Sequence, residues 1–359
     1  MDRSPVLFRC EGTRDAGWEA LYQCLTFAAA LQRRRRTAYF MGNYEPFPLL
    51  SQVARGGNEY LAADHPIGSP EDCNATIRQI RRTGAAAVIV AAPGVSTEYL
   101  RELGSAGAMV AVLDSEANAH FSSKLVFNPL LGPEIRDYDL EQGTQACIGR
   151  RYAIVRPIFR RQRPIRPIDP QPPFRAIIAF GDDDAAGQSL VRAQELLAAS
   201  RVDKISVVVR SQHHQIVELK ELAEQYKGRL EVLTEPSELG TRLPRAHFAL
   251  TSGDGWSLEM ACVGVPQFVM TQNARHVPNG RIMEEEGAAL YLGEASKVSN
   301  GELRDAIQNL LSDQLERVGM SRCARRLIDG RGPDRMVNAL EIMLHPAAAQ
   351  EPEMERMAA

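Results

Sequence analysis

Acidic side chains gather in the first loop of the chain, where a short apolar run gives way to a helical pattern. The segment RCEGTRDAGWEALYQ (9–23) contains Glu11, Asp15 and Glu19. A carboxylate held beside a substrate can act as a general base, so each of the three is a candidate catalytic residue. The alternative is structural, because acidic residues in the first turn of a helix stabilise it through the helix dipole.

A glycine-rich turn at 251–264, TSGDGWSLEMACVG, has features of a phosphate-binding loop. Glycines let backbone N–H groups approach a ligand closely, and a helix N-terminus favours an anion. We therefore expect a diphosphate beside this turn and a ribose on the carboxylate of Glu259. Asp254 counts against a phosphate because like charges repel, and an ordinary strand-to-helix turn is the alternative. The candidate nucleotide-binding residues of the turn are Ser252, Gly253, Asp254, Gly255, Trp256 and Glu259.

Three consecutive aspartates follow another predicted strand, in FGDDDAAGQ (180–188). Gly181, directly before them, is a further candidate nucleotide-binding residue. The aspartates could bind a divalent cation, or two of them could serve as general acid and base. The alternative is helix N-capping, which aspartate favours. We favour capping, and expect neither a metal nor a cofactor.

A further group of polar residues lies in NARHVPNG (273–280), after the apolar run PQFVMTQ. Arg275 could neutralise the charge that builds on a leaving diphosphate. His276 and Asn279 are candidates to contact the substrate beside it. A lone histidine is more often structural, so packing is the alternative for His276.

The segments that must position these residues alternate between strand-like and helix-like patterns. The apolar runs AAVIVAA (86–92) and MVAVLD (109–114) are typical of strands buried on both faces of a parallel sheet. Helical stretches at 71–83 and 96–104 separate such runs, and the pattern restarts at FRAIIAFG (174–181). This alternation predicts an α/β fold of two doubly wound Rossmann-like domains. Their ligand would lie in the interdomain cleft, at the carboxyl ends of the strands.

Chain length and proline content set the expected domain limits. The chain has 359 residues, more than the ~250–300 residues at which single cores stop growing. Six prolines within 157–173 disfavour helix and central strand, and indicate a semi-rigid linker with solvated arginines, contact with an anionic ligand being the alternative. The expected parts are a sugar-side domain at 1–156, the linker at 157–173, a nucleotide-side domain at 174–330, a helix at 331–346 packing back on the first domain, and a flexible tail at 347–359.

Composition argues against several classes of protein. The net charge of −3 gives no electrostatic basis for binding nucleic acid. The N-terminus carries charges within its first apolar stretch, unlike a signal peptide, and no apolar run approaches the ~20 residues of a membrane span. Six scattered cysteines without a CxxC pair argue against a metal site or a disulfide framework. We expect a cytoplasmic protein with reduced thiols, and the oligomeric state stays open.

Several stretches carry a resemblance to a known family. IGRRYAIVRPIF (148–159) looks like G-x-x-Y-A-L-L-R-P-E-F, and RRLIDGRGPDRMV (325–337) looks like the ending D-G-x-G-x-x-R-V. VPNGRIMEEEGAALYLG (277–293) and, more weakly, VFNPLLG (126–132) also fit. Over about residues 5–345 the chain resembles the nucleotide-sugar hydrolases of pseudaminic acid biosynthesis and the related spore-coat polysaccharide proteins. The resemblance implies the glycosyltransferase-B superfold, shared with the transferase that adds N-acetylglucosamine in peptidoglycan assembly.

The residues that carry this family's chemistry differ here. The family's first loop, G-x-G-H-x-x-R-C-L, has a histidine proposed as the base. Ala20 stands at that position, and Gln23 stands where the arginine is expected. Glu259 matches the family's late glutamate. Two glycine loops and a late asparagine–glutamine pair also differ, reading GDDD, GDGW and Arg-His at 181–184, 253–256 and 275–276.

The resemblance implies an enzyme that acts on a UDP-type nucleotide sugar at its anomeric carbon, by hydrolysis or by transfer to an acceptor. The setting would be surface-glycan or flagellin-glycan biosynthesis. Glu19, Glu11 or Asp15 would then replace the missing histidine as the base. The alternative is a catalytically inactive relative that keeps the fold to bind a ligand or a partner, since function resides in the site and not in the fold.

Overall fold

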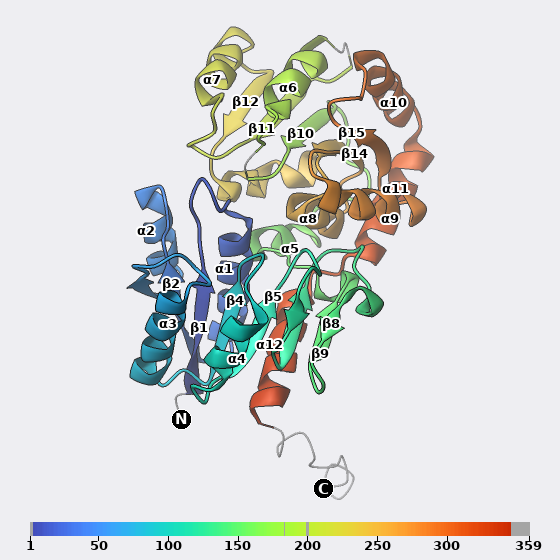
Figure 1. The fold of residues 1–359 in the computed structure, drawn as a ribbon. Helices are drawn as coiled ribbons and strands as arrows, with labels where there is room; N and C mark the ends of the chain where they lie inside the picture. Colours follow the sequence, from blue (N-terminus) through green and yellow to red (C-terminus); the bar gives the residue numbers. More distant parts are fainter. Residues whose placement is uncertain (1–2, 183, 199–200, 346–359) are drawn as a thin grey trace, which may run out of the picture.

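Two parallel β-sheets covered by helices make up the protein (Figure 1). The computed structural model describes residues 3–182, 184–198 and 201–345. We call the first sheet with its helices the first domain, and the second sheet with its helices the second domain. This architecture confirms the predicted α/β class with two doubly wound, Rossmann-like sheets.

The first domain contains a seven-stranded sheet in the order β3-β2-β1-β4-β5-β7-β9, and each neighbouring pair is parallel. Its central strands β4 and β5 are buried apart from the half-buried Met109 at the start of β5, as their continuous apolar runs predicted. The strands are β1 (Arg3–Cys10), β2 (Arg36–Gly42), β3 (Glu59–Ala62), β4 (Ala87–Ala91), β5 (Met109–Leu113), β7 (Leu125–Asn128) and β9 (Gln145–Ile148), with a separate pair β6 (His120–Phe121) and β8 (Asp139–Leu140). The helices are α1 (Glu19–Gln32), α2 (Phe47–Arg55), α3 (Pro70–Thr83) and α4 (Thr97–Gly104).

The second domain contains a six-stranded parallel sheet in the order β12-β11-β10-β13-β14-β15. The strands are β10 (Arg175–Ala179), β11 (Lys204–Val208), β12 (Leu230–Leu233), β13 (Phe248–Thr251), β14 (Gln267–Thr271) and β15 (Leu290–Glu294). The helices are α6 (Gln188–Ala198), α7 (Ile216–Gln225), α8 (Gly255–Val263), α9 (Val277–Glu285) and α10 (Asn300–Ser312). The two strand orders differ mainly at their ends, so the two domains have nearly the same topology.

The chain order reverses once in each sheet, between β1 and β4 and between β10 and β13. In open α/β sheets, ligands bind in the crevice beside such a reversal, outside the carboxyl ends of the strands. The loops that leave β1, β10 and β13 there are the same loops that carry the acidic and glycine-rich motifs of the sequence. The topology therefore explains why motifs far apart in the chain face one cleft.

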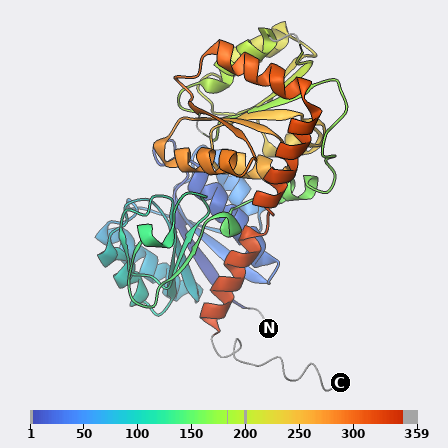
Figure 2. The same ribbon diagram turned by 90° about the vertical axis from the view of Figure 1, so that its right-hand side faces the viewer.

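The last helices join the two domains. α11 (Gln314–Leu327) packs on α8, and α12 (Gly332–Leu344) packs on α1. Figure 2 shows these helices passing from the second domain back to the first. Met336, Val337 and Leu340 of α12 are buried in the first-domain core, and Glu341 pairs with the buried Arg36. Within the described ranges, no helix is both long and apolar enough to cross a membrane.

The prediction that 157–173 contains no helix is wrong. A short helix, α5 (Pro157–Gln162), occupies its start, because proline is compatible with the first position of a helix, where no N–H bond is required. The expected solvation of the arginines is also wrong for two of them. Arg163 donates to three backbone carbonyls, and the buried Arg166 donates to the carbonyl of Ala246. These bonds tie the segment to the second domain, while the exact domain limits stay a prediction.

Candidate functional site

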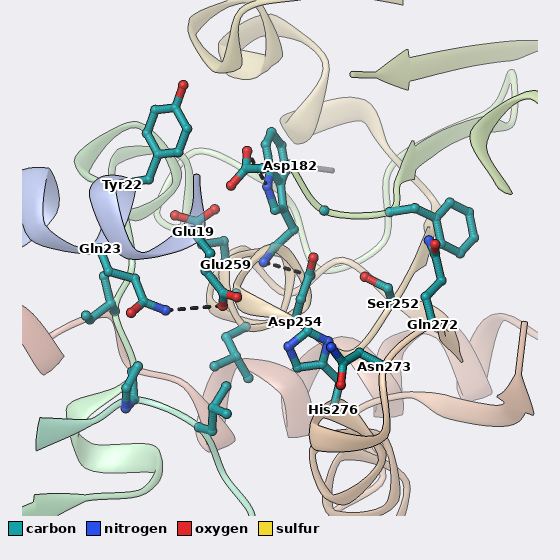
Figure 3. Close-up of a pocket in the computed structure, with 18 of the residues that line it drawn as sticks. Glu19, Tyr22, Gln23, Asp182, Ser252, Asp254, Glu259, Gln272, Asn273 and His276 are labelled. Atoms are coloured by element: carbon teal, nitrogen blue, oxygen red, sulfur yellow. Dashed lines mark hydrogen bonds between the residues drawn. The ribbon is translucent and has the colours of Figure 1, made fainter. Parts of the chain in front are cut away.

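A cavity of about 230 Å³ lies between the two domains. Its walls come from α1 of the first domain, from the segment before α5, and from the loops after β10, β13 and β14 (Figure 3). The predicted site residues that line it are Glu19, Gly181, Ser252, Asp254, Gly255, Trp256, Glu259, Arg275 and His276. The structure therefore brings together residues separated by more than 250 positions in the chain.

Glu19 reaches across the cleft from the start of α1. The Arg275 guanidinium, which follows β14 in the second domain, donates to Glu19 Oε2 at 2.8 Å. Gln23, one turn further along α1, donates to Glu19 Oε1 at 3.2 Å. A Cβ placed on Gly255 would lie 3.9 Å from Glu19 Oε1, so the carboxylate also stands close to the first residue of α8. A carboxylate and a guanidinium from opposite domains thus meet inside the cavity.

Ala20, at the position of the family's histidine, does not line the cavity. It is packed against the core of the first domain. One step along a helix turns a side chain by about 100°, which places Glu19 and Ala20 on different faces of α1. Of this pair, Glu19 is the residue that lines the cavity.

Glu259 is fully engaged by Arg156, a residue that sequence reasoning did not single out. The Arg156 backbone N–H and Nε both donate to Glu259 Oε1 at 2.8 Å, and Nε and Nη2 donate to Oε2. Burial would lower the pKa of Arg156, but the Glu259 carboxylate raises it above its ordinary value. A ribose diol at Glu259 would therefore share an acceptor already held by an arginine. The sequence did contain a signal for Arg156, because this residue lies in the stretch IGRRYAIVRPIF, which resembles the family motif.

A second ion pair and two aromatic rings surround the same wall. Asp182 accepts bonds from Arg210 at 2.7 Å and from the Trp256 indole at 3.3 Å. The Arg210 guanidinium lies 3.8 Å from the ring centre of Tyr22, and the Arg156 guanidinium lies 4.1 Å from that of Trp256. Such cation–π contacts hold the aromatic rings in place. Tyr22 and Arg210 were not predicted as site residues, since neither a lone tyrosine nor a lone arginine stands out in a sequence. Asp182 was one of the three aspartates for which capping was favoured, and it instead lines the cavity and pairs with Arg210.

Two polar atoms near this wall are buried without a hydrogen-bond partner among the residues that the structure describes: Tyr22 Oη and Arg156 Nη1. Burial raises the pKa of Tyr22 to about 12, so the phenol stays protonated at neutral pH. Both residues line the cavity. Each could donate to an oxygen atom of a ligand once the cleft adjusts around it.

Asp254 caps α8, accepting bonds from the backbone N–H groups of Trp256 and Ser257 at 3.0 and 3.3 Å. This is the structural role that the sequence offered as the alternative for the glycine-rich turn. Burial, and after it the charges of Glu19 and Asp182, raise the pKa of Asp254 to about 8. Figure 3 shows these acidic side chains in one part of the cavity. At neutral pH Asp254 is therefore mostly protonated, which reduces its repulsion of a bound phosphate.

His276 lines the cavity but is held neutral. Burial, and then the charge of Arg275, lower the pKa of His276 to about 3. Arg275 Nε donates to His276 Nε2 at 3.2 Å, so the imidazole serves as an acceptor that orients the arginine. The histidine positions Arg275 and carries no charge at physiological pH.

The remaining predicted site residues do not line the cavity. Glu11 is paired with the buried Arg9, and Asp15 lies outside the lining. Gly253 has a φ of +78°, where a side chain would be strained, and forms part of the turn backbone. Asn279 is buried, accepting from the Leu131 N–H and donating to the Gly253 carbonyl, each at 2.7 Å. Asn279 thereby ties the first domain to the glycine-rich turn.

The aspartates after β10 have separate structural partners. Asp184 accepts from the backbone N–H groups of Gln188 and Ser189 at the start of α6, which is the predicted capping role. Asp182 pairs with Arg210, and Asp183 lies outside the described residues. In the part of the chain that the structure describes, no cluster of three or more histidine, cysteine or acidic side chains could hold a metal.

Comparisons with known proteins agree with this fold. No protein-family model matches the chain. It is 26% identical over 259 residues to the spore coat polysaccharide biosynthesis protein SpsG of Bacillus subtilis (strain 168), a match covering 69% of this chain and 74% of SpsG.

Solved structures of glycosyltransferase-B proteins superimpose on nearly the whole chain. MurG of Acinetobacter baumannii aligns over 94% of this chain and 99% of its own, at 13% identity and a TM-score of 0.64. The spinosyn rhamnosyltransferase SpnG complexed with thymidine diphosphate covers 94% and 100%, at 14% identity and a TM-score of 0.62. MnaA of S. aureus, in a co-structure with UDP, covers 96% and 97%, at 13% identity and a TM-score of 0.59. The chain therefore has the glycosyltransferase-B fold.

Proposed function

We propose that this protein is an enzyme that acts on a nucleotide-activated sugar at its anomeric carbon, in polysaccharide biosynthesis. The observation that carries the proposal is the meeting of Glu19 and Arg275 inside the interdomain cavity. One can accept a proton and the other can neutralise a leaving diphosphate. The likeness to SpsG and the binding of UDP and thymidine diphosphate by structural neighbours support it.

In the proposed reaction, the bond between the anomeric carbon and the diphosphate oxygen breaks, and the nucleoside diphosphate leaves with the electron pair. The oxygen of water or of an acceptor hydroxyl forms the new bond to carbon, and its proton passes to Glu19. Arg275 stabilises the negative charge that develops on the leaving diphosphate. The nucleotide would lie against Gly181, Ser252 and Trp256 of the second domain, which line the opposite wall.

The type of reaction and its biological setting are also part of the proposal. Hydrolysis by water is one version of the reaction, and pseudaminic acid or flagellin-glycan biosynthesis would be its setting. Transfer to an acceptor is the other version. The six cysteines are free thiols, which supports the proposed cytoplasmic location.

The second candidate function is ligand or partner binding without catalysis. It is favoured by Ala20 at the histidine position, and by the saturation of Glu259 with bonds from Arg156. Such a protein would keep the cavity but lack turnover.

A binding screen followed by a turnover assay tests the proposal. Thermal unfolding is measured with UDP, TDP, UDP-N-acetylglucosamine and other nucleotide sugars. A ligand that binds only the native state raises the free energy of unfolding by about 2.7 kcal/mol when its concentration is a hundred times its dissociation constant. Release of the nucleoside diphosphate is then followed with the ligands that bind. Stabilisation together with release supports the enzyme, and stabilisation alone supports the binding protein. No stabilisation by any nucleotide or nucleotide sugar refutes the proposed enzyme.

A further inference from the structure

The cavity offers few cations to an anionic ligand. Among its described lining residues the arginines are Arg156 and Arg275, and His276 is neutral because burial lowers its pKa to about 3. Arg156 is paired with Glu259 and has only Nη1 without a partner among the described residues, and the neighbouring Arg210 is paired with Asp182. The backbone N–H groups of Trp256 and Ser257 in the first turn of α8 are occupied as well, by Oδ1 of Asp254.

Arg275 differs from the other two arginines in its partner and its exposure. Its carboxylate partner, Glu19, belongs to the opposite domain. The side chains are 33% and 27% exposed, whereas those of Arg156 and Glu259 are 14% and 4% exposed. A partly exposed ion pair is weak, because water competes for both charges. Arg275 is therefore the cation that a ligand can most easily take over.

We propose that Glu19 occupies the place beside Arg275 that a phosphate of the substrate takes, and that binding exchanges the carboxylate for the phosphate. The exchange rests on the proposed function. It explains how one side chain can be an ion-pair partner before binding and a base afterwards. A carboxylate paired with an arginine is a poor proton acceptor, and loss of the arginine to the diphosphate raises its basicity.

The chemistry favours a doubly charged ligand in this exchange. The diphosphate of a nucleotide sugar carries two negative charges against one on the carboxylate, and the terminal phosphate of the UDP product or of pyrophosphate offers three acceptor oxygens to the guanidinium. A ligand without phosphate gains nothing from Arg275. The site should therefore select diphosphates over the corresponding nucleosides, and Glu19 should act as a competitor to them.

The test compares the affinities of the wild type and Glu19→Gln for UDP, inorganic pyrophosphate and uridine by calorimetry. Removing the competing charge should tighten UDP and pyrophosphate binding about three- to fivefold, the scale of an exposed ion pair, and leave uridine unchanged. Arg275→Gln should weaken UDP and pyrophosphate about tenfold or more, since it removes a charged hydrogen-bond donor. The matched control is Glu98→Gln, which alters an exposed acid in the first turn of α4, away from the cavity, and should change no affinity.

The outcomes separate the exchange from the proposed function. Equal or weaker binding of UDP and pyrophosphate by Glu19→Gln overturns the exchange, because it shows that Glu19 does not compete for Arg275. If the wild type binds no nucleotide, the nucleotide-sugar function fails and pyrophosphate decides the exchange alone. The exchange is overturned if pyrophosphate binds to neither the wild type nor Glu19→Gln, or if it binds to both with equal affinity. Thermal unfolding of each variant without ligand shows whether it is folded.

Discussion

Two arginine–glutamate pairs stand in the same cavity, and their surroundings give them different roles. Arg156–Glu259 is buried, joins several hydrogen bonds and lies over Trp256. Arg275–Glu19 is partly exposed and connects one domain to the other. The charges are the same in both pairs. Burial makes the first pair a fixed part of the fold, whereas partial exposure to water leaves the second pair able to exchange partners.

The largest effect is expected from breaking the buried pair. Glu259→Gln leaves the Arg156 charge buried without its counter-ion, so the free energy of unfolding should fall by about 3–5 kcal/mol. Urea denaturation measures this. The double variant Arg156→Met with Glu259→Leu should recover much of the loss, because two apolar residues of similar volume replace the pair. A single variant as stable as the wild type would show that the pair is not structural.

Breaking the exposed pair should affect turnover and not stability. Glu19→Gln should slow release of the nucleoside diphosphate by about 10²–10⁴-fold, the range for losing a general base, while unfolding changes by less than about 1 kcal/mol. Ala20→His should not restore release, because position 20 packs against the first-domain core. Unimpaired release by Glu19→Gln would remove Glu19 from the mechanism.

The protonation of Asp254 should make stability fall as pH rises. Its pKa is about 8 in the folded protein against an ordinary value of 3.8, so between these values the native state holds a proton that the unfolded chain has released. Stability therefore declines as pH rises through this window. The melting temperature of the wild type, relative to Asp254→Asn, should drop between pH 5 and pH 9. Asparagine also caps a helix, so the variant keeps that role, and parallel pH profiles would contradict the raised pKa.

The smallest effect is expected at Tyr22. Tyr22→Phe removes a buried hydroxyl that has no partner in the described part of the chain, so stability should be unchanged or rise by about 1 kcal/mol, and the ring still covers Arg210. If ligand oxygens bond to this hydroxyl, the same variant should bind a UDP-sugar less tightly while its affinity for UDP stays as before. A loss of stability without ligand would mean that the hydroxyl already has a partner in solution.

Much of the fold could be predicted from the sequence, and the residues show why. Strands such as β4 and β5 are continuous apolar runs, and α4 and α10 follow a serine whose side chain caps the helix. α2, β3 and β9 were not predicted, because their residues are partly exposed and carry no continuous apolar pattern. The proline-rich segment was misjudged, since proline interrupts a helix but can also begin one.

The sequence by itself determined two parallel sheets and the loops that face the cleft between them, because burial on both faces and the positions of loops in βαβ units follow from local patterns. Only the tertiary structure decided which charges meet. Arg156 takes the carboxylate expected for ribose, Arg275 takes the carboxylate expected to be the base, and Asp254 caps α8 where a phosphate was expected. The reason is physical: an ion pair depends on distance and burial, and residues 256 positions apart, such as Glu19 and Arg275, acquire both only when the domains pack together.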